Sequence, residues 1–192
     1  TTSNFLSNII LKYKIIEGFG ASVDYQFERQ SETSTGLADE NSFTARDYVN
    51  RFSQIVNGNV VYIVPNGGIL DKSSNIMNVN NLRGQLSFDR TYGLHNINAI
   101  AGAEMRSTKV DGNNVRYYGY NSNNLTTGLV DFTKPYPSII NGGNQTVFNG
   151  NSLRQTDRRF LSQYANAAYT FDNKYIISGS LRRDGSNLFG LK

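Results

Sequence analysis

The sequence predicts an all-β chain of antiparallel strands, and three observations lead to this fold class. Six stretches alternate apolar and polar residues, which is the period of a strand with two different faces. Very short and very long connections join these stretches in turn, so the strands would pair as three hairpins. No run approaches the roughly 18 apolar residues of a membrane-spanning helix.

The first predicted hairpin covers residues 4–16 and 19–30. The alternation is weak in 4–16. It is clear in 19–30, where Val23 and Tyr25 share one face and Asp24 lies on the other. This period of two predicts a strand with one apolar face.

The second predicted hairpin covers residues 76–92 and 95–107. Arg90 interrupts the apolar face of 76–92. The apolar face of 95–107 includes Ala99 and Ala101, and its other face is mostly polar. Both stretches therefore fit strands with two different faces.

The third predicted hairpin covers residues 158–171 and 174–184. The pattern is weaker in 158–171. In 174–184, Ile177 and Leu181 lie on one face and Ser180 on the other. This completes six predicted strands.

The connections fall into two classes. Two long loops cover 31–75 and 108–157, and three tight turns are expected at Glu17-Gly18, Gly93-Leu94 and Asp172-Asn173. Strands of about 10 to 13 residues, tilted near 45°, span about 25 Å or a little more, the height of an outer-membrane apolar band. Tyr and Phe residues gather near the tight turns, as in an interfacial aromatic belt. The loop asymmetry favours the wall of an up-and-down transmembrane β-barrel over a soluble sandwich, whose strands are also rich in aromatic residues.

Composition excludes several classes of protein. The net charge of +4 comes from scattered residues without a basic run, which argues against nucleic acid as a partner. The chain has no cysteine, and its one histidine, His95, has no metal-ligand spacing around it, so we expect no cofactor and no metal. The catalytic motifs of hydrolases, nucleotide-binding enzymes and zinc proteases are missing, so we expect no enzyme.

The two long loops carry their own signals. In 31–75, an apolar pattern at helical spacing predicts a short amphipathic helix, with Asn41 or Ser42 as the cap. Its members are Ala45, Tyr48, Val49, Phe52 and Val56. The loop 108–157 is rich in Asn, Gly, Ser and Thr. Its aromatic rings could stack on a ligand while polar side chains bind it, and the candidate contacts are Tyr117, Tyr118, Tyr120 and Tyr136. For any single tyrosine, packing within the loop is the alternative.

The polar faces of the predicted strands carry charged side chains that would point into the lumen of a barrel. The candidates are Glu104, Arg106, Arg182 and Asp184. For the last two residues, a pairing network along one strand is favoured over contact with a ligand or another domain.

Several strings in succession resemble the SusC/RagA family of TonB-dependent outer-membrane transporters of Bacteroidetes-type bacteria. They are HNINAIAGAE at 95–104, YANAAYTFDNKYIISGS at 164–180 and LRRDGSNLFG at 181–190. RDYVNRFSQ at 46–54 and IVPNGGIL at 63–70 are similar to an extracellular loop segment of that family.

The resemblance implies a barrel of about 22 strands with a plugged lumen. It also implies energy from the TonB complex and a SusD-like surface lipoprotein over the mouth. The chain would supply about six neighbouring strands, with its long loops outside the cell. No signal peptide, TonB box or plug domain is recognised in the sequence, so we expect an interior fragment of a longer protein.

The leading hypothesis is therefore part of an active outer-membrane importer of oligosaccharide or peptide nutrients, whose outward faces meet lipid. A passive porin-like barrel would share the strands but lack the plug. A soluble or cell-surface β-sandwich that binds glycans is the alternative from another class.

Overall fold

The structure is a computed structural model that describes residues 1–140 and 142–187. Within these residues the chain divides into two compact units. The sheet unit contains residues 2–31, 76–111 and 155–187, and the loop unit contains residue 1 with 32–75 and 112–154. No helix in the described residues is long and apolar enough to cross a membrane.

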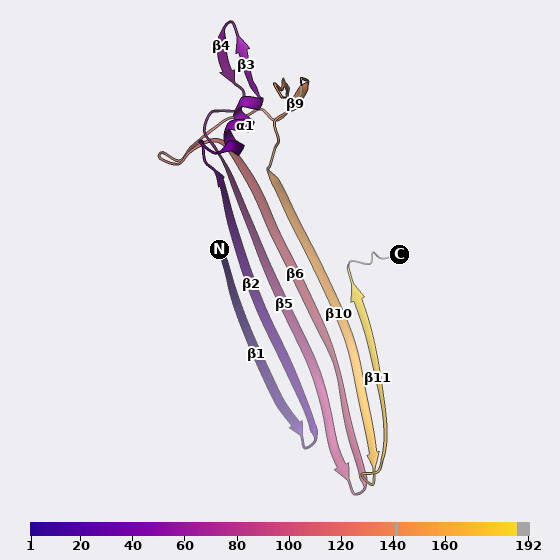
Figure 1. The fold of residues 1–192 in the computed structure, drawn as a ribbon. Coiled ribbons are helices and arrows are strands. Elements are labelled where there is room, and N and C mark those ends of the chain that lie inside the picture. Colours follow the sequence, from indigo (N-terminus) through magenta and orange to yellow (C-terminus); the bar gives the residue numbers. More distant parts are fainter. Residues whose placement is uncertain (141, 188–192) are drawn as a thin grey trace. The chain divides into compact units, whose positions relative to one another are not determined.

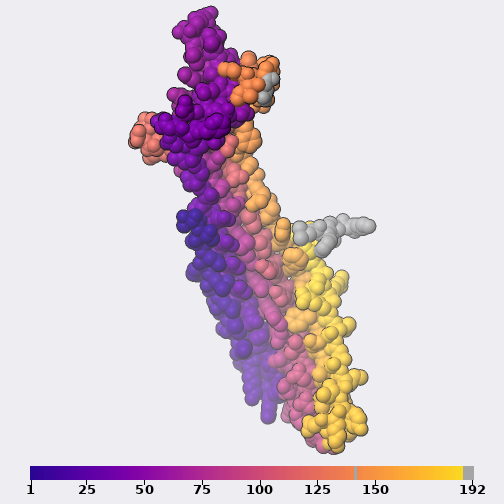
Figure 2. Space-filling view, in the orientation of Figure 1, coloured from indigo at the N-terminus to yellow at the C-terminus, as the bar shows by residue number. Residues whose placement is uncertain are grey.

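Six long strands follow one another in an up-and-down sheet (Figure 1). In the space-filling view their atoms lie side by side in chain order, from indigo to yellow (Figure 2). They are β1 (Thr2–Ile16), β2 (Phe19–Ala38), β5 (Gly68–Tyr92), β6 (His95–Asn121), β10 (Ser152–Phe171) and β11 (Tyr175–Ser186). Their order in the sheet is their order along the chain, and neighbouring strands run in opposite directions. The predicted all-β class and the three hairpins are confirmed.

The three hairpin turns lie where the sequence predicts them. Glu17 and Gly18 join β1 to β2, and Gly18 has a positive φ of 77°. Residues 172–174 form the third turn, in which Asp172 and Asn173 have φ values of 50° and 51°, the left-handed region that Asp and Asn tolerate. A turn at Gly93, with φ 58°, joins the second hairpin.

The predicted bounds of the long loops, 31–75 and 108–157, are wrong at both ends of each loop. Strand β2 continues to Ala38 and β5 begins at Gly68, while β6 continues to Asn121 and β10 begins at Ser152. The extension over 31–36, SETSTG, is polar on both faces, and the one over 112–121, GNNVRYYGYN, has no regular alternation of apolar and polar residues. Backbone pairing holds them in the sheet, but alternation marks a strand only where one face is apolar.

The loop unit contains the helix and the short strands. Helix α1 (Phe43–Arg51) is followed by the hairpin of β3 (Ser53–Val56) and β4 (Asn59–Tyr62). Strand β7 (Thr126–Gly128) pairs with β6, and β8 (Pro135–Pro137) pairs with β9 (Asn144–Thr146). The predicted helix is therefore present, although Val56, the last residue of its pattern, lies in β3.

An apolar core holds the loop unit together. Its buried members are Ala45, Val49, Phe52, Val64, Ile69, Tyr118 and Val147. The first three lie on one side of α1 and its C-terminal cap, which is the face that the helical spacing predicts.

The turn after Val64 packs closely on the second long loop. A Cβ at Gly119, which has φ 63°, would lie 2.7 Å from the Cβ of Pro65, and a Cβ at Gly128 would also collide with the Pro65 ring. Gly128 pairs with Tyr118, the chain neighbour of Gly119, so the two glycines lie close together in the β6–β7 pair. Glycine is required here because the proline ring occupies the space of a side chain.

Candidate functional site: a two-faced sheet and an aromatic loop unit

The sheet unit has an apolar face that lies open. In the β10–β11 register, Ala165 pairs with Leu181 and Tyr169 pairs with Ile177, so these side chains share one face. Leu181 is 78% exposed and Ile177 is 70% exposed. Large apolar side chains of the other strands are exposed in the same way, among them Leu11, Tyr13, Val23, Leu82, Leu86 and Met105. A face of this kind is stable in water only if something apolar covers it.

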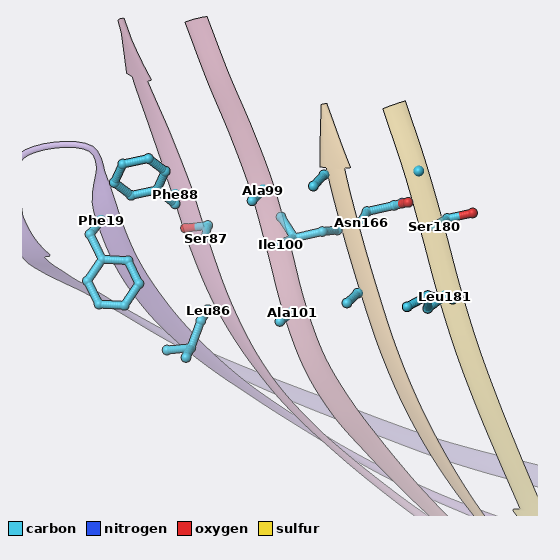
Figure 3. A pocket seen from close by; sticks show the side chains of 13 residues that line it. Phe19, Leu86, Ser87, Phe88, Ala99, Ile100, Ala101, Asn166, Ser180 and Leu181 are labelled. Atoms are coloured by element: carbon cyan, nitrogen blue, oxygen red, sulfur yellow. The ribbon is translucent and has the colours of Figure 1, made fainter. Parts of the chain in front are cut away.

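A shallow groove of about 630 Å³ crosses this apolar face (Figure 3). Its floor consists of small residues of β6, β10 and β11, which include Ala99, Ala101 and Gly179. Leu86 and Leu181 stand on its sides. The groove exists because small side chains lie next to one another across three neighbouring strands.

His95 lies beside aromatic residues at the turn end of this unit. Its Nδ1 is 2.5 Å from the Tyr169 hydroxyl, and its ring centroid is 5.1 Å from that of Phe171. These contacts hold the imidazole ring among the aromatic side chains of the turn.

The other face of the sheet unit carries hydrogen-bonded polar side chains. Tyr164 pairs with Arg182 and Ser162 with Asp184 across the β10–β11 register. Arg182 Nε donates to both oxygens of the Asp184 carboxylate at 2.9 and 3.0 Å, and the Ser162 hydroxyl donates to the same carboxylate. The expected pairing of Arg182 with Asp184 is therefore present. Glu104 and Arg106 line the same hollow as Arg182.

A second polar contact joins strands that are not neighbours, and the sequence does not predict it. Arg83 Nε on β5 donates to the Tyr164 hydroxyl on β10 at 2.7 Å, and that hydroxyl donates to Gln85 at 2.9 Å. The tyrosine reaches across β6 over Gly102, where an added Cβ would lie 2.6 Å from its hydroxyl oxygen. Gly102 on the polar face of β6 was the available signal, but the alternation of apolar and polar residues does not show which residues of different strands lie side by side.

The four candidate tyrosines of the loop unit have different surroundings. Tyr118 is 1% exposed, and it stacks on Tyr48 with ring centroids 5.5 Å apart. Tyr136 packs partly buried against the same core, whereas the side chain of Tyr117 is at the surface. Tyr120 lines a hollow of only about 20 Å³, room for about one water molecule. The structure does not bring the four rings into one binding surface.

Tyr118 is a correction to the ligand-contact prediction, because its side chain holds the loop unit together. Its hydroxyl donates to the Phe148 carbonyl oxygen at 2.8 Å, and the Phe148 amide donates to the Tyr48 hydroxyl at 2.9 Å. Burial raises the pKa of Tyr118 well above that of a free tyrosine. The ring therefore acts as a neutral core residue and does not reach a ligand.

An ion pair fixes β5 to β6 within the loop unit. The Arg116 guanidinium donates two hydrogen bonds of 2.6 Å to the two carboxylate oxygens of Asp71. The Asp71 carboxylate raises the pKa of Arg116. The same guanidinium lies 5.1 Å from the centroid of the Phe148 ring. This bidentate arrangement is the stronger kind of arginine–carboxylate contact.

Consecutive antiparallel strands with one exposed apolar face, one polar face and tight turns at one end are typical of the wall of a transmembrane β-barrel. Comparison with known proteins gives the same class. No family model matches the chain. The TonB-dependent receptor P39 of Formosa agariphila is 28% identical over 112 residues, which are 47% of this chain and 11% of that protein.

Solved structures share the fold over almost the whole chain. The RagAB peptide importer in its closed-closed state superimposes with a TM-score of 0.66, at 13% identity over 96% of this chain. Its open-open state superimposes with a TM-score of 0.66 at 15% identity over 96% of this chain. A further structure of the RagAB peptide transporter superimposes with a TM-score of 0.58 at 16% identity over 99% of this chain. The chain spans 18% of each of these proteins. The resemblance to a piece of a SusC/RagA-type TonB-dependent transporter is therefore confirmed, although residues 188–190 of the last matching string lie outside the described residues.

Proposed function

We propose that this chain forms part of the barrel wall of an outer-membrane importer that takes up oligosaccharide or peptide nutrients with energy from the TonB complex. The open apolar face of the sheet unit carries this proposal. Its strands β1 and β11 have 15 and 12 residues, which at a tilt near 45° span about 28 to 35 Å and suffice to cross the membrane. The apolar face would contact lipid, and the polar face would line the lumen.

The partners follow from the same proposal. The loop unit would lie outside the cell, where its surface, with Tyr117 and Tyr120, would be available to the ligand or to a SusD-like lipoprotein. TonB would act through a part of the protein that precedes this fragment. Barrel closure would come from further strands that pair with β1 and β11, which are the two edge strands of the sheet within the described residues, because an unpaired strand edge is too costly in lipid.

The test uses the complete protein that contains this chain, in its own bacterium. We expect it in the outer-membrane fraction, and we expect uptake of its nutrient to be lost both on deletion of the gene and on inactivation of TonB. Uptake that continues without TonB would identify a passive porin. Recovery of the protein in the aqueous fraction would contradict the membrane assignment and favour the soluble β-sandwich.

A further inference from the structure

The polar face of the sheet unit contains a hollow of about 410 Å³ with more basic than acidic side chains in its lining. Three guanidinium groups line it, from Arg106 on β6, Arg158 on β10 and Arg182 on β11, against the single carboxylate of Glu104. These residues all lie on the face of the Tyr164–Arg182 pair, because strand residues two apart share a face.

The arginines of this hollow differ in whether another side chain of the protein already binds their guanidinium groups. Arg182 is bound to Asp184, and its Nη2 donates to the Ser162 hydroxyl at 3.3 Å. Within the described residues, Arg106 and Arg158 have no ion pair and no hydrogen bond from their side chains. Two donor groups of the hollow are therefore free to bind an anion, and Arg182 is held in place beside them.

The chemistry of the lining selects a class of ligand. A guanidinium group presents its N–H donors in a planar fork that matches the two oxygens of a carboxylate. Phe160, which is 41% exposed, adds an aromatic surface to the same hollow. A carboxylate attached to an apolar or planar group would satisfy both parts of the lining.

We propose that this hollow binds a carboxylate group of the imported molecule as it passes along the barrel wall. The inference rests on the proposed function, because only in an importer does the polar face line a path for ligands. It narrows the substrate class to acidic molecules, such as peptides with free carboxyl groups or oligosaccharides of uronic acids.

The experiment uses the complete protein, purified in detergent, and two probe mixtures. One is a tryptic digest of serum albumin, and the other is a set of oligogalacturonates. Each is offered with free carboxyl groups and after methyl esterification, and the bound molecules are identified by mass spectrometry. We expect the free acids of one mixture to bind at least roughly tenfold better than their esters, as charge-assisted hydrogen bonds allow.

Matched variants assign the effect to the hollow. The double variant Arg106→Gln with Arg158→Gln should bind free acids and esters equally. The control, Arg159→Gln with Arg183→Gln, removes the same charge from the opposite face, because each residue is the chain neighbour of a lining arginine. The control should keep the preference for free acids. The mixture that shows the effect distinguishes peptide from oligosaccharide cargo.

Several results would overturn the proposal. One is equal binding of acids and esters by the unmodified protein, and another is a preference for acids that survives in the Arg106/Arg158 variant. A third is a change in the melting temperature of this variant with no change in binding, which would show that these arginines hold another part of the same protein. Uptake by cells distinguishes a failure of the carboxylate site from a failure of the importer proposal. If uptake depends on TonB but ignores esterification, the carboxylate site fails and the importer stands.

Discussion

The loop unit buries a compact apolar core, whereas the sheet unit leaves most of its large apolar side chains open. Nine of the ten buried core and polar residues of the described chain, all except Val79, belong to the loop unit. On the sheet unit, residues such as Leu11 and Leu181 remain 67% and 78% exposed. The sheet is nevertheless the more regular structure, with an unbroken strand order.

This difference shows that the two units need different surroundings. The loop unit packs a core of its own around Phe52, Val64 and Tyr118, as a water-exposed structure does, although side chains such as Leu129 stay exposed. The sheet unit satisfies its backbone polar groups by strand pairing but offers its apolar side chains to the outside, as a structure in lipid does. Substitutions in the two units should therefore report on two environments.

The largest expected effect is the loss of the loop-unit core in Tyr118→Ala. Truncation of this buried ring should destabilise the loop unit by about 3 to 5 kcal/mol, because it leaves a cavity. Tyr118→Phe should cost about 1 kcal/mol through loss of the hydrogen bond to Phe148. Hydrogen exchange of residues 112–140 in the complete protein measures both. Tyr117→Ala is the surface control, and an equal effect there would contradict the core assignment.

The second prediction concerns the apolar face of the sheet unit. Leu181→Arg should destabilise the folded protein in lipid by about 2 to 4 kcal/mol, while Ser180→Arg, on the polar face, should cost far less. Urea titration of the complete protein in lipid vesicles compares the two variants. Because Leu181 makes few contacts within this chain, a large difference would come from the environment. Equal effects would show that the face does not meet lipid.

The smallest expected effect separates two possible helix caps in the loop unit. The Ser42 hydroxyl accepts a hydrogen bond from the Ala45 amide at 3.2 Å, so Ser42→Ala should destabilise α1 by about 1 kcal/mol. Asn41→Ala removes the other residue that the sequence offered as a cap and should leave α1 unchanged. Exchange of the Ala45 amide reports the difference. A larger effect of Asn41→Ala would contradict this assignment and show that Asn41 caps α1.

The sequence was most informative where one face of a strand is apolar. The hairpin turns at Gly18, Gly93 and Asp172-Asn173 were predictable because turn residues interrupt a period of two. The strand extensions over 31–38 and 112–121 were not predictable, since the first is mostly polar on both faces and the second mixes tyrosines with Asn, Gly and Arg without a period of two. For the site, the pairing of Arg182 with Asp184 followed from their spacing on one face, but the contribution of Arg158 and Phe160 did not.

By itself, the sequence determined the all-β class, the number of long strands and which side chains share a face of each strand. These features depend on the spacing of apolar and polar residues along each strand, which the sequence shows directly. Only the tertiary structure decided that Tyr118 is buried, that Tyr164 reaches Arg83 across Gly102, and that three arginines of different strands share one hollow. Such contacts depend on the register between strands, and register is set by packing and by pairing between residues far apart in the chain.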